Sequence, residues 1–216
     1  MPVTVKMTSD FICPWCLIGE RRLVQAIEAL PDGIKVDVEW SPFELNPDMQ
    51  PEGMDRKIYR SLKFGSWERS LELDAHTVAA SRDVDVSFDY DAITRTPNTF
   101  LAHRLSWLAA QEGQQRPVVA AILSAYFEQG RDIGDIGTLT AIAAEQGLDA
   151  ELIKGALAGD TGAGEVRRLE QEALNRSVHG VPHFTIGETS AGGAQPVAVL
   201  RDAILSEHAR LNAAAA

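Results

Sequence analysis

Two short segments near the N-terminus alternate apolar and polar residues, as half-buried β-strands do. These segments are residues 3–9 (VTVKMTS) and 34–40 (IKVDVEW). Between them, apolar residues recur at helical spacing from Leu17 to Leu30, and Pro14 suits the first helical turn because its missing N–H costs nothing there. The first forty residues are therefore predicted to form a strand–helix–strand unit with parallel strands and a right-handed crossover.

The middle of the chain, from about residue 54 to residue 175, has mainly helical periodicity. Glycine, proline and aspartate mark the breaks, and Asp149 is expected to cap a helix N-terminus. Residues 84–90 alternate only briefly, so we expect an extended loop there. The predicted helices span residues 54–63, 67–82, 97–112, 116–129, 138–146, 149–158 and 162–177.

The strand pattern returns near the C-terminus. Residues 183–186 (HFTI) predict a short strand, and a turn then leads to a short partner strand at 190–193. Pro196 opens a helix that is expected to run to about Leu211. This order predicts one α/β domain, made of residues 1–45 and 178–216, that is interrupted by an all-helical insertion at residues 46–177.

The composition is that of a folded protein able to bury a full core without disulfides or structural metals, since 45% of the 216 residues are hydrophobic. The 31 acidic residues outnumber the 20 Lys and Arg, and the resulting charge of −11 argues against a nucleic acid or an anionic membrane as partner. No apolar run reaches the ~18 residues of a transmembrane helix. The N-terminus also lacks the regions of a signal peptide, so a cytoplasmic location is expected.

The two cysteines, Cys13 and Cys16, directly follow the first predicted strand and begin the first predicted helix. This context is typical of a redox motif, whereas an inert core pair, half of a zinc site and a structural disulfide are the alternatives. Two cysteines cannot form an all-cysteine zinc site, and the five histidines do not fall at ligand spacing, so no metal is expected.

A thiol attacks a disulfide only as thiolate, and a helix N-terminus lowers a cysteine pKa from about 8.5 into the range of roughly 3.5–7.5. Cys16 follows Cys13 by one helical turn, so its sulfur can reach that of Cys13. We therefore predict that Cys13 attacks a substrate disulfide and that Cys16 resolves the mixed disulfide. Pro14 would stiffen the turn, and Trp15 is expected to lie exposed beside the sulfur as a substrate contact.

The order of strand, Cys13-Pro14-Trp15-Cys16, helix, strand and a late Gly180-Val181-Pro182 resembles the thioredoxin fold of the DsbA family. Three further segments are similar to its FrnE-like branch, which groups with 2-hydroxychromene-2-carboxylate isomerases and kappa-class glutathione transferases. They are residues 40–47 (WSPFELNP), 97–105 (PNTFLAHRL) and 193–196 (GAQP). The resemblance covers essentially the whole chain and implies an α/β thioredoxin fold with a large inserted all-helical domain.

The resemblance also implies a substrate site. Pro182 would be a cis proline that faces the cysteines, and the backbone of Val181 would pair with a substrate peptide. The insertion would line a groove, which holds glutathione in the isomerase and transferase relatives. Those relatives commonly carry serine at the position of Cys13, so the two cysteines of this chain favour dithiol chemistry. No cofactor is implied; glutathione, as a co-substrate, or a thioredoxin system would be the electron partner.

Two positions depart from the family pattern. Thioredoxin and DsbA carry a buried acid six residues before the first cysteine, where this chain has Met7. The nearest acid, Asp10, is expected to lie in the turn in solvent, so proton handling at Cys16 would lack its usual partner. His183 follows the proline where relatives carry an apolar or aromatic residue. It would either stabilise the Cys13 thiolate as imidazolium or be a simple strand residue.

Two other polar residues lie in family-like segments. Asn98 would line the groove, or would cap the helix that begins near Pro97. Gln195 would touch the rim of the active site beside a tight hairpin exit. His103, on a predicted amphipathic helix, is more typical of a packed, hydrogen-bonded residue than of a catalytic one.

The function expected first is that of a thiol-disulfide oxidoreductase or isomerase acting on a disulfide-containing protein or a small thiol. A second hypothesis is a glutathione-dependent isomerase or transferase that acts on an aromatic small molecule. A third is a redox-switched chaperone whose insertion holds unfolded clients. Relatives in this branch often dimerise, so a homodimer is an expectation that the resemblance alone carries.

Overall fold

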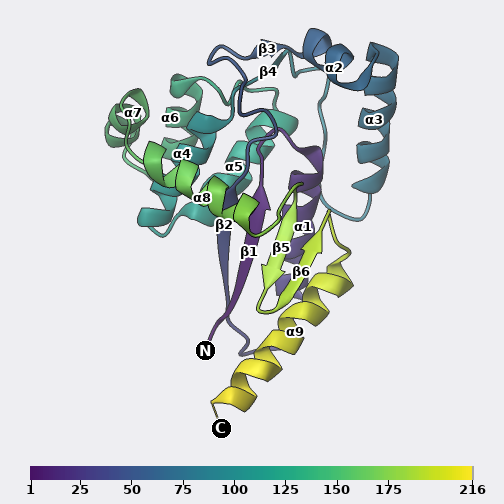
Figure 1. Cartoon of the computed structure of the whole chain (residues 1–216), viewed down its shortest axis with the longest axis vertical. Helices are drawn as coiled ribbons and strands as arrows, with labels where there is room; N and C mark the ends of the chain where they lie inside the picture. The colour runs from purple at the N-terminus through teal and green to yellow at the C-terminus, as the bar shows by residue number, and fades with distance from the viewer. Residues whose placement is uncertain (216) are drawn as a thin grey trace.

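The four strands of the main sheet bring the two ends of the chain together (Figure 1). The computed structural model describes residues 1–215. Its sheet has the order β2-β1-β5-β6, with β1 parallel to β2 and antiparallel to β5. In this sheet Met7 lies beside Trp40 on one side and Phe184 on the other. The strands are β1 (Val3–Ser9), β2 (Val36–Pro42), β5 (His183–Ile186) and β6 (Thr189–Gly192).

Helices cover both faces of this sheet. Because side chains alternate along a strand, the fully buried Val3, Val5 and Met7 share one face. Helices α1 (Pro14–Glu28) and α9 (Val197–Ala214) pack together on that face. The opposite face is covered near its upper end by α8 (Ala163–Asn175), which crosses in front of the sheet in Figure 1. The predicted strand–helix–strand start and hairpin–helix end are confirmed.

All remaining helices lie between β2 and β5 in the sequence, which confirms the helical insertion. Among them, α5 contacts both β2 and α1, so one buried core runs from the sheet into the insertion. The exact boundaries at 45/46 and 177/178 stay a prediction. These helices are α2 (Arg56–Phe64), α3 (Trp67–Ala80), α4 (Phe100–Gln111), α5 (Gln115–Phe127), α6 (Ile136–Glu145) and α7 (Ala150–Ala158), followed by α8.

The insertion also contains a small sheet that the helical periodicity concealed. Strands β3 (Met54–Asp55) and β4 (Arg95–Thr96) pair antiparallel, so the helix predicted from residue 54 begins only at Arg56. The helix predicted from residue 97 begins at Phe100 instead. The reason is local, since the Asn98 side chain accepts the backbone N–H of Phe100 at 2.9 Å and competes with helical hydrogen bonding.

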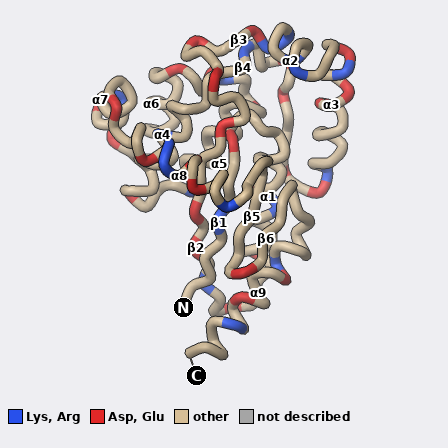
Figure 2. The backbone as a smooth tube through the Cα atoms, viewed as in Figure 1, with Lys and Arg blue, Asp and Glu red and all other residues tan. Residues whose placement is uncertain are grey.

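Charge is distributed unevenly among the helices. Acidic residues are spread along the whole chain, whereas basic residues gather on α2 (Figure 2). That helix carries Arg56, Lys57, Arg60 and Lys63 and has no acidic residue, although the chain as a whole has a net charge of −11. This local surplus of positive charge lies at the end of the molecule that holds the cysteines.

Candidate active site

Cys13 lies at the junction of strand and helix, as the sequence predicted. It is the N-cap residue of α1, with φ −95° and ψ 110°, and the helix begins at Pro14. No side chain caps this helix end. The backbone N–H of Cys16 donates to the Cys13 carbonyl at 2.9 Å, which places the second cysteine one turn inside the helix. The free N–H groups and the dipole of α1 therefore favour negative charge at the Cys13 sulfur.

The two thiols are free and lie in different environments. Cys13 is 5% exposed, and its Sγ donates to the Val181 carbonyl at 3.5 Å. Cys16 has no exposed surface, and burial raises its pKa well above the usual value, with the hydrogen bond to Cys13 as the next cause. Cys16 is therefore held in its protonated form inside the helix, whereas Cys13 lies at the helix end, so the two sulfurs are suited to different roles.

The peptide bond between Val181 and Pro182 is cis, as the resemblance implied. Pro182 is buried directly before β5, where its ring lies against Gly19 of α1. A Cβ atom at residue 19 would come within 3.2 Å of both the Pro182 and the Phe184 side chains. The glycine thus allows α1 to approach the segment that faces the cysteines.

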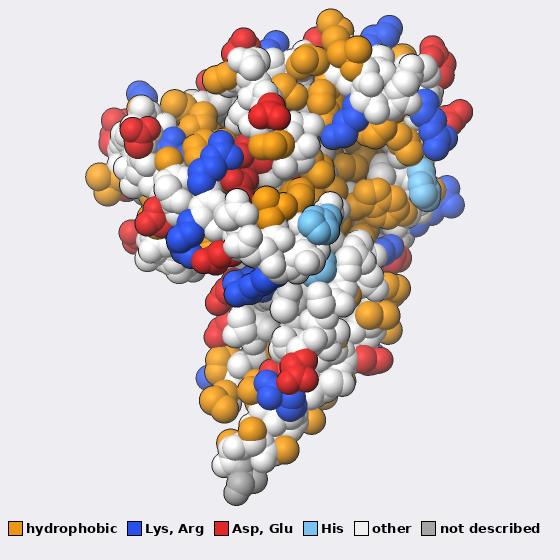
Figure 3. Space-filling view, viewed as in Figure 1, with side chains coloured by type: hydrophobic (Ala, Val, Ile, Leu, Met, Phe, Trp, Pro, Cys, Tyr) orange, Lys and Arg blue, Asp and Glu red, His pale blue; other side chains and the backbone are white. Residues whose placement is uncertain are grey.

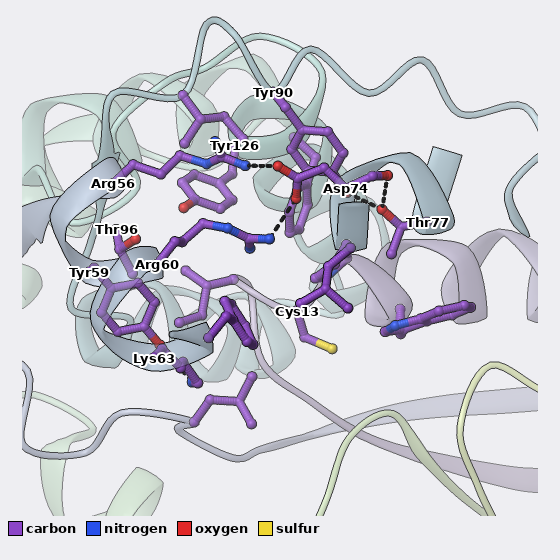
Figure 4. Close-up of a pocket in the computed structure, with 18 of the residues that line it drawn as sticks. Cys13, Arg56, Tyr59, Arg60, Lys63, Asp74, Thr77, Tyr90, Thr96 and Tyr126 are labelled. Atoms are coloured by element: carbon purple, nitrogen blue, oxygen red, sulfur yellow. Dashed lines mark hydrogen bonds and ion pairs between the residues drawn. The ribbon is translucent and has the colours of Figure 1, made fainter. Parts of the chain in front are cut away.

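A cavity of about 290 Å³ opens beside Cys13 between the first helix and the insertion (Figure 4). The space-filling view shows the hollow below α2 and beside α3, with apolar side chains in it (Figure 3). Residues 12–15 form one wall, and side chains of α2, α3 and α5 form much of the rest. The insertion therefore lines a groove at the active-site end, as the resemblance implied.

Charged side chains of α2 and α3 project into this cavity. Asp74 accepts hydrogen bonds from Arg56 at 2.6 Å and from Arg60 at 2.7 Å, as the dashed lines in Figure 4 show. Lys63 donates to the Tyr59 hydroxyl at 2.6 Å. The cavity wall thus holds the cationic side chains of Arg56, Arg60 and Lys63 and the carboxylate of Asp74. The cavity wall is apolar with a surplus of positive charge, which suits a ligand that has an apolar body and an anionic group.

Aromatic groups complete the cavity wall. Trp15 contacts His76 of α3 edge-on, with ring centroids 5.5 Å apart. It is half-buried, so the expectation of an exposed Trp15 is wrong; the insertion covers part of its ring. Burial raises the pKa of the Tyr90 and Tyr126 phenols well above the usual range, so both hydroxyls stay neutral.

The structure places three predicted substrate residues outside the cavity. The Asn98 amide donates to the Met49 carbonyl at 2.7 Å and ties two loops together. Gln195 donates to the Gly192 carbonyl at the exit of the β5–β6 hairpin. His183 points to the face covered by α8, where its ring bonds the Ser190 hydroxyl at 2.7 Å. Burial lowers the pKa of His183, which disfavours the imidazolium that one hypothesis required.

The expectation that Asp10 lies in solvent is wrong. Asp10 has no exposed surface, and its Oδ2 accepts the backbone N–H of Leu45 at 2.7 Å. Its Oδ1 lies 3.3 Å from Nε2 of His103, a buried residue of α4. The periodicity of the sequence gave no sign of this contact, because it joins residues 93 positions apart. The packed, hydrogen-bonded state expected for His103 is confirmed.

The arginines and tyrosines of the cavity were likewise absent from the sequence prediction. The one signal that could have pointed to them is that every charged residue of α2 is basic. Across residues 1–215, no group of three or more His, Cys, Asp and Glu side chains is placed to hold a metal ion. Within the same residues, every helix is too short or too polar to cross a bilayer.

Comparison with protein families gives a match over nearly the whole chain. Residues 4–205 match the model of the DSBA-like thioredoxin domain. The chain is also 31% identical over 208 residues to the uncharacterized protein YwbO of Bacillus subtilis (strain 168). That alignment covers 96% of this chain and 98% of the relative.

Solved structures share the complete architecture. A probable DsbA oxidoreductase of Streptomyces coelicolor is 30% identical and has a TM-score of 0.85, over 96% of this chain and 90% of that one. A 2-hydroxychromene-2-carboxylate isomerase has a TM-score of 0.74 at 17% identity, over 99% of each chain. This chain and the isomerase therefore share the same fold, including the helical insertion.

Proposed function

Because the chain belongs to the DSBA-like thioredoxin family, we propose that it catalyses dithiol–disulfide exchange, with Cys13 as nucleophile and Cys16 as resolving thiol. The observation that carries this proposal is the pairing of Cys13, at the N-cap position of α1, with a buried Cys16 whose pKa is raised. Cys13 is placed to be the thiolate, and Cys16 is kept protonated until it is needed.

The reaction consists of two exchanges. The Cys13 thiolate attacks one sulfur of a substrate disulfide, a bond forms between them, and the other substrate sulfur leaves as thiolate. Cys16 then loses its proton and attacks Sγ of Cys13, which releases the second substrate thiolate and leaves a Cys13–Cys16 disulfide. Two electrons have passed to the substrate, and a reduced thiol such as glutathione or a thioredoxin system returns them.

The substrate is held from two sides. Pro14 and Trp15 flank the reactive sulfur, while Val181 and Pro182 present backbone to a bound chain. The cation-lined cavity favours a small disulfide that carries an anionic group, or a protein disulfide with an acidic neighbour. A cytoplasmic location would favour reduction or isomerisation over net oxidation, because stable disulfides are rare in that compartment.

The first test is the equilibrium of the Cys13–Cys16 pair with glutathione redox buffers, measured by thiol trapping. We expect a reduction potential between about −270 and −120 mV, the range of redox catalysts of this fold. A Cys16→Ser variant should accumulate a mixed disulfide on Cys13, and Cys13→Ser should not. A potential below about −300 mV, or the absence of any disulfide, would contradict the proposal.

A glutathione-dependent isomerase is the second candidate, and the cationic cavity beside Cys13 is the observation that favours it. Calorimetry of glutathione binding to Cys13→Ser separates the two functions. Tight binding that survives the substitution, together with isomerase activity, would favour the second candidate. Loss of tight glutathione binding in Cys13→Ser, together with the absence of isomerase activity, would favour dithiol exchange.

A further inference from the structure

A second pocket lies at β2, which is an edge strand of the main sheet. It has a volume of about 270 Å³ and is lined by residues of β1, β2 and α4, with single residues of α5 and α8. Among residues 1–215, none lines both this pocket and the cavity beside Cys13. The proposed exchange makes no use of this pocket, so the chemistry of its lining points to a separate role.

The pocket is lined by polar side chains that are themselves almost fully buried. They are Ser9, Ser41, His103 and Ser106, and each is 7% exposed or less. Buried polar groups cost free energy unless they form hydrogen bonds. Several of them around one open space are what a site for a hydrogen-bonding molecule requires.

Trp40 adds a donor that has no partner. Its backbone is fixed by Gln115, whose side chain accepts the Trp40 N–H at 3.1 Å and donates to the Trp40 carbonyl at 3.2 Å. The indole Nε1 is buried and meets no hydrogen-bond acceptor within the described part of the chain. An acceptor atom of a molecule bound in the pocket would supply this missing partner.

The rest of the lining is apolar and aromatic, with one cation. Phe11, Trp40 and Trp107 contribute flat apolar rings. The Lys6 ammonium lies 3.6 Å from Oε2 of Glu39, which is too long for a hydrogen bond, and the Glu39 side chain is 56% exposed. Lys6 is therefore free to turn its charge toward a ligand.

We propose that this pocket binds a small planar aromatic carboxylate, with its ring against the tryptophans and its carboxylate beside Lys6. A carboxylate only accepts hydrogen bonds, so it matches a wall rich in hydroxyl, indole and ammonium donors. The volume is just below the roughly 300–1,000 Å³ of sites for drug-sized molecules, which suits a compound with one ring. The inference does not depend on the proposed function.

The four tryptophans allow a test that distinguishes the pockets. Trp40 and Trp107 line the proposed site, Trp15 lines the cavity beside Cys13, and Trp67 lines neither. Each indole N–H gives one signal in a ¹H–¹⁵N correlation spectrum, and single Trp-to-Phe variants assign these signals. We expect benzoate to shift the Trp40 and Trp107 signals in one saturable process with a Kd below about 1 mM, and to leave the Trp67 signal unchanged.

Charge variants test the place assigned to the carboxylate. Lys6→Gln should weaken the benzoate titration of the Trp40 signal about tenfold or more, because a charge-assisted hydrogen bond is lost. Glu39→Gln should instead tighten it about 2- to 5-fold, since a competing carboxylate is removed from beside Lys6. Lys63→Gln is the matched control, because Lys63 belongs to the cavity beside Cys13. Unchanged Trp67 signals in all three variants show that the fold is intact.

Two further probes test the chemical class. Benzylamine has a similar size and the opposite charge, so it should shift neither the Trp40 nor the Trp107 signal. Cyclohexanecarboxylate keeps the charge and loses the flat ring, so it should bind about 2- to 10-fold more weakly than benzoate.

Several results would overturn the inference. They are unchanged benzoate binding in Lys6→Gln, equal shifts with benzylamine, and the absence of a saturable shift of the Trp40 and Trp107 signals in the millimolar range. Binding that is lost in Lys63→Gln and kept in Lys6→Gln would place benzoate in the cavity beside Cys13 and would also contradict a second site. None of these results bears on dithiol exchange, which the reduction potential tests.

Discussion

Asp74 is the residue that holds the cationic wall of the cavity together. Its two carboxylate oxygens separately accept from Arg56 and Arg60, and its side chain is 7% exposed. Breaking a buried ion pair by removing one partner leaves an uncompensated buried charge, which costs more than the pair itself contributes. The tie between α2 and α3 therefore depends on this one carboxylate.

We expect Asp74→Asn to lower the free energy of unfolding by roughly 3–5 kcal/mol, because both guanidinium groups lose their charge partner. Urea unfolding followed by circular dichroism measures this change. Glu72→Gln on the same helix is the control, since its pair with Arg69 is exposed and should change stability by less than about 1 kcal/mol. Equal stability of the two variants would show that Asp74 carries no such role.

At the residue scale, the sequence predicted the positions of the two cysteines better than the residues around them. Cys13 and Cys16 were assigned from their place between a strand and a helix, which depends only on neighbouring residues. Asp10 was misplaced because its burial depends on Leu45 and His103, which are distant in the sequence. His183 was ambiguous because only the register of β5 decides which face of the sheet its ring occupies.

Among the elements, α2 has the clearest bearing on substrate choice. Its basic residues lie over an apolar cavity in a protein of net negative charge, so the local electrostatic potential there favours an anionic ligand. Sequence periodicity located the helix but shifted its start, because Met54 and Asp55 pair with a strand 40 residues later. Short strands of this kind leave no periodic signal of their own.

Substitution of Lys63 by glutamine should raise the KM for an anionic disulfide about 3- to 10-fold and leave the KM for a neutral one unchanged. The reason is that the Lys63 ammonium lies in the cavity wall and has only neutral hydrogen-bond partners, Tyr59 and Asn46. Steady-state kinetics measure the two KM values, with 5,5′-dithiobis(2-nitrobenzoate) as the anionic disulfide and bis(2-hydroxyethyl) disulfide as the neutral one. Lys154→Gln is the matched control, because Lys154 is an exposed residue of α7 outside the cavity. A similar change in KM with both substrates would contradict an electrostatic role for Lys63.

The whole molecule is one packed unit in spite of its interrupted domain plan. The buried core extends without a break from the strands to α4, α5 and α6. The alternation of strand and helix signals was enough to predict the interrupted plan. The same alternation could not predict that the buried core is continuous, because the packing of α5 on α1 and β2 joins segments that are far apart in the chain.

Urea should therefore unfold the sheet and the insertion in a single transition, since neither part can lose its packing without exposing the core of the other. Far-ultraviolet circular dichroism reports on the helices. Tryptophan fluorescence reports on Trp15 of α1 and Trp40 of β2 in the thioredoxin part, and on Trp67 and Trp107 in the insertion. The two probes should give coincident midpoints. Separate midpoints would show that the insertion is an independent folding unit.

The position of the cavity also bears on how proteins of this kind diversify. The proposed dithiol exchange would need only a few residues at the start of α1 and before β5, whereas much of the cavity wall is encoded by a separate stretch, α2 and α3. Mutations in that stretch can alter which molecules are recruited without touching the reactive pair. Selection can thus change which substrates are bound and how the reactive pair works independently of each other, within a single chain.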